Sequence, residues 1–275
     1  MTISLSKIAL VQAMLLLFTS FPAMAAALLI DMGTPATLTT EALLAMSGAA
    51  TIQVPDDVTF HRTMTYRAVP LRSLPGVRTL PADAELQITA TDGFVINLPA
   101  ALVRGDSGRG ATPWLAIEPQ DKPWPRTSKG TDVGPFYLVW INPGASGVMS
   151  EQWPYQINAI CAVASRAAKW PQLAVDDSLP ANSPIRRGQA LFATQCMVCH
   201  RINGAGDASV GPDLNRPHNP TEYFQAWALR AYIRDPKSIR EWPGMKMPGF
   251  DKGSLSDPDL DAIIAYLGYM RHRRK

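Results

Sequence analysis

Cysteine is scarce in this chain of 275 residues, which has three cysteines, at positions 161, 196 and 199. A cysteine-based zinc site needs a second pair of ligands, and Cys161 has no other cysteine near it. The N-terminal apolar run, Ile8 to Phe18, is short, because a membrane-spanning helix requires about 20 residues. Nothing in the sequence resembles a nucleic-acid-binding module. These absences argue against a zinc protein, a membrane-spanning chain and a nucleic-acid-binding protein.

The composition is that of a globular protein with an uneven charge. Hydrophobic residues make up 47% of the chain and charged residues 18%, so nothing indicates general disorder. Residues 26–180 contain 11 Lys and Arg against 14 Asp and Glu, whereas residues 181–275 contain 14 against 9. The length allows two domains, and the basic C-terminal part favours an acidic partner.

The first 25 residues have the order of a secretory signal peptide. Lys7 supplies the positive charge, the apolar run follows, and Pro22 precedes the small-residue site Ala23-Met24-Ala25. We expect cleavage after Ala25 and export into a bacterial periplasm, with no membrane span left after cleavage. A retained membrane anchor is the alternative, and the lack of a cysteine near this site argues against a lipoprotein.

The other two cysteines belong to the motif Cys196-Met197-Val198-Cys199-His200, which is typical of c-type haem attachment. Two thiols at this spacing reach two vinyl groups on one porphyrin edge, and the imidazole that follows supplies the proximal iron ligand. The alternatives are half of a zinc site and a redox-active Cys-x-x-Cys pair, whose usual βαβ setting the flanking residues lack. We predict one covalent haem c on Cys196 and Cys199, with His200 bound to the iron.

Residues 26–170 are predicted to form a mixed, β-rich domain. Alternating apolar residues from Ala84 to Ala90, followed by Asp92-Gly93, predict a β-hairpin. The continuous apolar run Phe136 to Trp140 predicts a buried strand. Thr39 or Thr40 is expected to cap a short helix. Further strands are expected at residues 51–54, 58–61, 113–117 and 153–163.

Several segments of this domain resemble the sulfite oxidase-like, molybdopterin-binding fold over about residues 35–165. They are Thr65–Leu71, Asp92-Gly93-Phe94 and Gly134–Trp140. Enzymes of that family hold molybdenum through a cysteine in a mid-domain loop, whereas Cys161 lies near the end of this domain and is expected to be a small buried side chain. The resemblance therefore implies a domain of that fold without molybdenum, used to bind or position a partner.

Other polar and aromatic residues of this domain are expected to be structural. His61 lies alone beside a strand, and the acidic pairs Asp56-Asp57 and Asp83/Glu85 lack a third partner, so solvated turns are expected there. Four tryptophans are expected in the core rather than in a pocket: Trp114, Trp124, Trp140 and Trp153.

Residues 171–182 are rich in polar residues and proline and are predicted to be a linker. Ser183 and Pro184 then have the order of an N-cap and first helical residue. The helix that follows, with the run Gly188-x-x-x-Phe192-x-x-x-Cys196, resembles the first helix of class I cytochromes c, and the resemblance extends over about residues 183–272. In this family a proline carbonyl orients the proximal imidazole, which implies that Pro212, in Gly211-Pro212-Asp213-Leu214, is the partner of His200.

Two further helices belong to this resemblance. Thr221 with Glu222 is expected to cap a helix that ends near Asp235, and Ser256 is expected to cap the final helix. Apolar residues of that last helix, from Leu260 to Met270, recur at helical spacing. The resemblance implies that it crosses the first helix where Gly188 lets the two backbones approach.

The sixth iron ligand is expected on the loop from Arg240 to Asp251, which is too rich in Gly and Pro for a helix. Met247, followed by Pro248-Gly249-Phe250, is similar to the family's ligand loop and is the predicted ligand. Met245 is the competitor, and His218 would give bis-histidine ligation instead. Met270 is expected to be a core residue.

The sequence therefore predicts an α+β protein: a β-rich sulfite oxidase-like domain (26–170), a linker (171–182) and an all-α class I cytochrome c domain (183–275). Because His/Met ligation leaves the iron no open position, single-electron transfer between redox partners, such as a periplasmic dehydrogenase or oxidase, is favoured over catalysis. The N-terminal domain would dock the partner. The alternatives are a molybdenum-dependent sulfite dehydrogenase-like enzyme that passes electrons to the haem, and a haem-based sensor in which Met247 dissociates.

Overall fold

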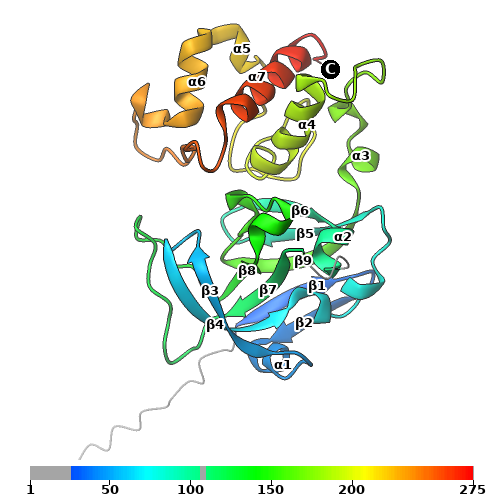
Figure 1. Cartoon of the computed structure of the whole chain (residues 1–275), viewed down its shortest axis with the longest axis vertical. Helices are drawn as coiled ribbons and strands as arrows, with labels where there is room; N and C mark the ends of the chain where they lie inside the picture. The colour runs from blue at the N-terminus through cyan, green and yellow to red at the C-terminus, as the bar shows by residue number, and fades with distance from the viewer. Residues whose placement is uncertain (1–25, 106–109, 275) are drawn as a thin grey trace, which may run out of the picture.

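The computed structural model describes residues 26–105 and 110–274. Figure 1 shows a β-rich N-terminal region below a helical C-terminal region, with the first long helix of the helical region directly above the strands. The predicted α+β fold class is confirmed. The predicted signal peptide, residues 1–25, lies outside the described residues. No helix within the described ranges is both long and apolar enough to span a membrane.

The β-rich region contains two sheets. The larger has the order β2-β1-β9-β5-β6, and it is antiparallel except where β1 and β9 run parallel. The smaller has the order β3-β4-β7-β8 and is antiparallel throughout. The strands of the larger sheet are β1 (Ala27–Asp31), β2 (Pro35–Thr39), β5 (Ala84–Ala90), β6 (Val95–Pro99) and β9 (Ile157–Ala164). Those of the smaller are β3 (Ala50–Asp57), β4 (Arg62–Pro70), β7 (Thr112–Ile117) and β8 (Phe136–Ile141).

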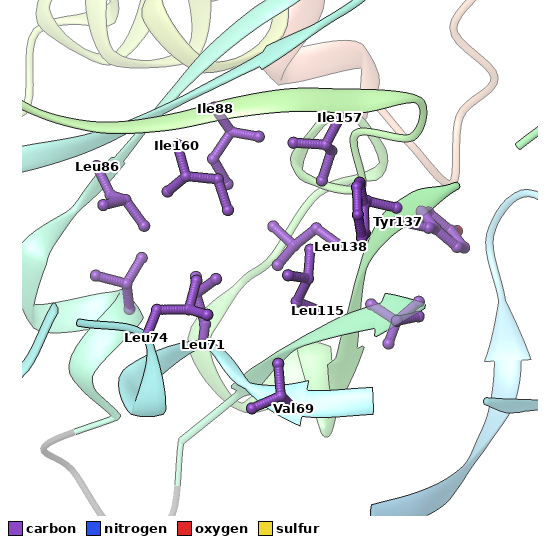
Figure 2. Packing of buried hydrophobic residues seen from close by; sticks show 14 of the residues in the cluster. Val69, Leu71, Leu74, Leu86, Ile88, Leu115, Tyr137, Leu138, Ile157 and Ile160 are labelled. Atoms are coloured by element: carbon purple, nitrogen blue, oxygen red, sulfur yellow. The ribbon is translucent and has the colours of Figure 1, made fainter. Parts of the chain in front are cut away.

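The core of this region lies between the two sheets. Figure 2 shows apolar side chains of β5 and β9, such as Ile88 and Ile160, meeting Leu115 of β7 and Leu138 of β8. The run Phe136 to Trp140 is fully buried, as its continuous apolar sequence predicts for a strand that is covered on both faces. Trp140 and Trp153 are buried in this core, whereas Trp114 and Trp124 are half-buried against it.

The predicted hairpin is present as β5 and β6, with Leu86 opposite Leu98 in its register. Its turn forms because the Asp92 carboxylate accepts a hydrogen bond from the backbone N–H of Phe94, at 3.0 Å, and Gly93 has a φ of +91°. The tip of this hairpin is important for the site described below, because it faces the helical region.

Three expectations for the β-rich region are wrong: a strand at residues 58–61, and solvated positions for Asp57 and Glu85, whereas Asp56 and Asp83 are exposed as expected. The segment 58–61 is a turn and not a strand, because the Asp57 carboxylate accepts hydrogen bonds from the backbone N–H groups of the two residues after Val58. Asp57 is only 1% exposed and also accepts from the hydroxyls of Tyr66 (2.8 Å) and Tyr137 (3.3 Å). Glu85 is buried as well, 8% exposed. Both side chains are therefore interior groups and not solvated turn residues.

The α-helices within the described ranges are α1 (Thr40–Leu44), α2 (Ala100–Arg104), α3 (Arg166–Lys169), α4 (Pro184–Gln195), α5 (Pro220–Tyr223), α6 (Ala226–Arg234) and α7 (Asp257–Arg271). The predicted caps Thr39, Ser183 and Ser256 each accept a hydrogen bond from the first turn of their helices. The predicted cap at Thr221 is wrong: Asn219 caps α5, together with Glu222, and a break separates α5 from α6.

Helices α4 and α7 cross in direct backbone contact. A Cβ atom on Gly188 of α4 would lie 1.9 Å from the carbonyl oxygen of Ala262 and 2.8 Å from Cβ of Tyr266, so only glycine fits there. The crossing predicted from Gly188 is confirmed. It fixes the direction of α4, and so the position of the residues that follow it.

Candidate functional site

The Cys-x-x-Cys-His motif forms a tight turn at the end of α4. The backbone N–H of Cys196 donates to the carbonyl of Phe192 at 2.9 Å, and the N–H of His200 donates to the carbonyl of Cys196 at 2.8 Å. Both cysteine side chains are half-buried and neither is in a disulfide. The turn therefore presents two thiols and one imidazole from a single short segment whose start is fixed by α4.

The imidazole of His200 is held by the loop that contains Gly211 and Pro212. Its Nδ1 lies 2.8 Å from the carbonyl oxygen of Pro212, and since a carbonyl only accepts, Nδ1 carries the proton. Burial lowers the pKa of His200, which favours the neutral ring. Nε2 is then the unprotonated nitrogen, as a metal ligand requires. The structure thus brings Pro212 and His200 together in the predicted relation.

Gly211 is a site residue that the sequence reasoning did not single out. A Cβ atom at this position would lie 2.5 Å from Cε1 and 2.6 Å from Nδ1 of His200, so the backbone itself packs against the ring. The N–H of Gly211 also donates to the carbonyl of Cys199 at 2.8 Å. The signal available in the sequence was its place directly before Pro212.

Asp213 organises the same loop from its other side. Its carboxylate accepts from the backbone N–H groups of Asn203 (3.1 Å), Gly204 (2.6 Å), Asn215 (2.8 Å) and Arg216 (3.0 Å). The buried side chain of Asn215 connects this loop to α7, because its amide donates to Asn203 and to the carbonyl of Met270, each at 2.8 Å. The loop that holds the imidazole is therefore fixed to the last helix.

The Met247 loop is anchored by α6. Arg234 of α6 donates to the carbonyls of Phe250 (2.9 Å) and Asp251 (3.1 Å), and Gly249 lies so close that a Cβ atom would be 2.4 Å from the carbonyl oxygen of Arg234. The Met247 side chain is half-buried and packs against the core of the helical region. The segment around it has no helical structure, as predicted.

Of the competing ligands, Met245 lies on the Met247 loop and His218 lies elsewhere on the helical region. Met245 is half-buried on the same loop, two residues before Met247, and its N–H donates to the carbonyl of Trp242 at 3.3 Å. His218 is exposed. Met270 is fully buried in the helical core, as expected.

The part of the chain that the structure describes offers these two thiols too few partners for a zinc site. Burial, followed by the charge of Glu151, raises the pKa of Cys196 and of Cys199 to about 12, so both are protonated at neutral pH. A structural zinc site needs four protein ligands. Among the residues that the structure describes, no three His, Cys, Asp or Glu side chains form a metal-binding group. Two neutral thiols, a neutral imidazole and a thioether on a separate loop are the donors that haem c uses.

The attachment motif lies against the β-rich region. The N–H of Val95, at the start of β6, donates to the carbonyl of Val198 inside the motif at 3.1 Å. Val198 is 2% exposed and packs in the core of the β-rich region. Asp207, on the loop after the motif, accepts from Gln87 of β5 at 2.8 Å and from Lys169 of α3 at 2.7 Å. The motif is therefore enclosed between the helical region and the β5–β6 hairpin.

The remaining candidates do not join this site. Cys161 lies in the middle of β9, half-buried, opposite Asp31 of β1 and Gln87 of β5. Burial raises the pKa of its thiol. His61 is exposed in the turn after Asp57, with a φ of +52°.

Comparison with known proteins supports the interpretation of the helical region. Residues 185–271 match the family model of cytochrome c, which is less than half of the chain. Members of that family bind haem c covalently and transfer electrons, and Cys196 and Cys199 lie within the matched residues. The match does not extend over the β-rich region. No curated protein matches the chain.

Proposed function

We propose that this protein is an exported mono-haem cytochrome of the periplasm that transfers single electrons between redox proteins. Cys196 and Cys199 would hold one haem c through thioether bonds, with His200 and Met247 as the iron ligands. The observation that carries the proposal is the geometry of His200, whose Nδ1 is bound by Pro212 while its ring packs on Gly211. This arrangement leaves Nε2 free in a segment that also presents two neutral thiols.

The residues of the chain have separate roles in this proposal. Pro212 keeps the proton of His200 on Nδ1 and so fixes the ligating tautomer. Arg234 holds the loop that contains Met247, whose sulfur would supply the second protein ligand of the iron. When bound, haem c supplies a one-electron Fe(III)/Fe(II) couple, and a methionine ligand raises its reduction potential. With both axial positions filled by protein, outer-sphere electron transfer is the reaction that this donor set supports.

For the β-rich region we propose a docking role toward a redox partner, as a domain of residues 26–170 that functions without molybdenum. The linker would be residues 171–182 and the cytochrome domain residues 183–275. Support for a role close to the haem comes from the contacts of β5, β6 and α3 with the attachment motif and with Asp207.

The ligand assignment is tested by absorption spectroscopy of the exported protein. Cys196→Ser combined with Cys199→Ser should abolish haem that survives denaturing extraction with acid acetone. Met247→Ala should keep the haem attached and lose the methionine-to-iron charge-transfer band. Met245→Ala, on the same loop, is the matched control and should keep that band.

The opposite pattern would refute the assignment. If Met247→Ala retains the band and Met245→Ala loses it, Met245 is the ligand. If the wild-type protein purified from a bacterial periplasm contains no covalently bound haem, the proposed function is wrong. Cell fractionation with an antibody against the chain tests the proposed location.

A further inference from the structure

A carboxyl group of the β-rich region lies beside the attachment motif. Glu151 belongs to η4 (Ser150–Gln152), a short 3-10 helix that contacts both α4 and β6. The side-chain amide of Gln195, the last residue of α4, donates to the sulfur of Met149, directly before η4. These contacts fix Glu151 at the end of α4, where Cys196 begins the motif, without using its own carboxyl group.

The charge of Glu151 acts on the groups that would carry the haem. After the larger effect of burial, it raises the pKa of Cys196 and of Cys199 to about 12. It also raises the pKa of Tyr155, again after burial. A charge that acts on both attachment sulfurs acts on the porphyrin edge bonded to them.

Other charged groups around this cluster come from two further segments. Asp92, at the exposed tip of the β5–β6 hairpin, acts on Cys199 and on Tyr155. Lys129, an exposed side chain of the loop before β8, is the cation that acts on Glu151. The Ser150 hydroxyl donates a hydrogen bond to the Glu151 carboxylate. Burial outweighs both and raises the pKa of Glu151 to about 7. Its carboxyl group is therefore divided between its neutral and charged forms near neutral pH.

We propose that Glu151 couples electron uptake at the haem to proton uptake from solvent, so that the reduction potential depends on pH. This inference rests on the function proposed above. A redox protein partner gives one electron to Fe(III), and solvent gives one proton to a carboxylate oxygen of Glu151. One O–H bond forms, and the products are Fe(II) and a neutral carboxyl group. Glu151 ligates nothing and acts through its charge, so it is a tuning residue of the electron transfer.

The physical reason is the repulsion between the added electron and a carboxylate in a partly buried interface. Reduction should raise the proton affinity of Glu151 by on the order of tenfold. A tenfold change corresponds to about 59 mV for a one-electron couple. At low pH the carboxyl group is neutral in both redox states and the potential is high. As the pH rises through about 7, the carboxylate forms and the potential falls.

The test is a spectroelectrochemical titration of the full haem-loaded protein between about pH 5.5 and pH 8.5, the range around the pKa of Glu151. The wild-type potential should fall across this range. Glu151→Gln should remove the fall and keep the potential near the low-pH value of the wild type. Glu151→Asp, which keeps a carboxyl group, should retain a pH dependence. Asp83→Asn removes one charge from an exposed position of the same region and should leave the curve unchanged.

An infrared difference spectrum between the two redox states provides a direct readout. Reduction near pH 7 should produce the C=O band of a neutral carboxyl group, and Glu151→Gln should lack that band. A wild-type potential independent of pH, or a Glu151→Gln protein with the wild-type slope and an intact haem spectrum, overturns this proposal alone. Absence of covalent haem overturns the proposed function and this inference with it.

Discussion

The substitution Gly188→Ala tests whether the close contact of α4 and α7 supports the haem site. The added Cβ atom would lie 1.9 Å from the carbonyl oxygen and 2.6 Å from the carbonyl carbon of Ala262. Both are backbone atoms in the middle of a 15-residue helix, so no side chain can rotate to make room. The two helices must instead separate by more than an ångström, which disturbs the packing of Phe192 on Tyr266.

The magnitude follows from two opposing effects. Overpacking a well-packed interface costs typically 1–3 kcal/mol, and contact with backbone favours about the upper value. Replacing a helical glycine with alanine stabilises the helix by about 1 kcal/mol, because alanine has the higher helix propensity. We therefore expect Gly188→Ala to lower the free energy of unfolding by about 2 kcal/mol.

Gly268, on α7, is the matched control for this substitution. A Cβ atom there would have no neighbour within 4 Å, so Gly268→Ala should be neutral or stabilising by up to about 1 kcal/mol. Guanidinium denaturation of the haem-loaded proteins, followed by far-ultraviolet circular dichroism and haem absorption, measures both. Equal stability of Gly188→Ala and Gly268→Ala would refute the reasoning.

Three further predictions concern buried or paired acids. Asp213→Ala removes the acceptor of four backbone N–H groups and should lower the unfolding free energy by about 2–3 kcal/mol in urea denaturation, with loosened histidine ligation visible in the haem spectrum. Asp57→Ala leaves the buried hydroxyl of Tyr66 without its acceptor and removes one of the two partners of Tyr137, whose hydroxyl also lies 2.9 Å from that of Thr59. It should cost about 2–3 kcal/mol, whereas Asp56→Ala, at an exposed position, should stay within about 0.5 kcal/mol. Hydrogen bonds from basic neighbours lower the pKa of Asp257 from 3.8 to about 2. Its stabilising contribution is therefore complete above pH 3.8 and is lost as the pH falls through 2. Thermal melts of Asp257→Asn should depend less on pH in this range than those of the wild type.

The helical region was largely predictable because its signals are local. The hydroxyls of Ser183 and Ser256 each accept a hydrogen bond from a backbone N–H within three residues, so a short segment of sequence is enough to predict the cap. The crossing at Gly188 was implied by the resemblance to class I cytochromes c, and its physical reason is that a side chain at this position would meet the backbone of α7. The cap at Asn219 was missed because Thr221, two residues later, is an equally good cap by residue type, and the choice depends on Glu222 reaching the N–H of Asn219.

The buried acids of the β-rich region could not be found in this way. Asp57 is bonded by Tyr66 and by Tyr137, which lies 80 positions away, and Glu85 is paired with Arg166, 81 positions away. An acidic residue between strands normally indicates a solvated turn, since burying a carboxylate without partners is costly. The partners of Asp57 come together only when β3, β4 and β8 assemble into the smaller sheet, and the partner of Glu85 only when α3 packs against β5. A local sequence pattern therefore predicts the wrong burial for residues whose hydrogen-bond partners lie far away in the sequence.

The residues of the candidate site also differ in whether a local sequence signal identifies them. Cys196, Cys199 and His200 belong to one short motif, and Pro212, which the resemblance to class I cytochromes c implied, lies 2.8 Å from Nδ1 of His200 through its carbonyl oxygen. Glu151 carries no such signal, because its place beside the cysteines depends on how the β-rich region meets α4.

The contacts of the two regions place the two sides of the haem site under different structural control. The attachment motif is held by the β-rich region, through Val95 and through the two hydrogen bonds to Asp207. The Met247 loop is held by Arg234, within the helical region. A redox partner that binds the β-rich region, as proposed above, would therefore act first on the attachment side, where Glu151 lies, and would leave the anchors of the Met247 loop in place. Binding at that region should accordingly change the reduction potential of the haem while the proposed Met247 ligation persists.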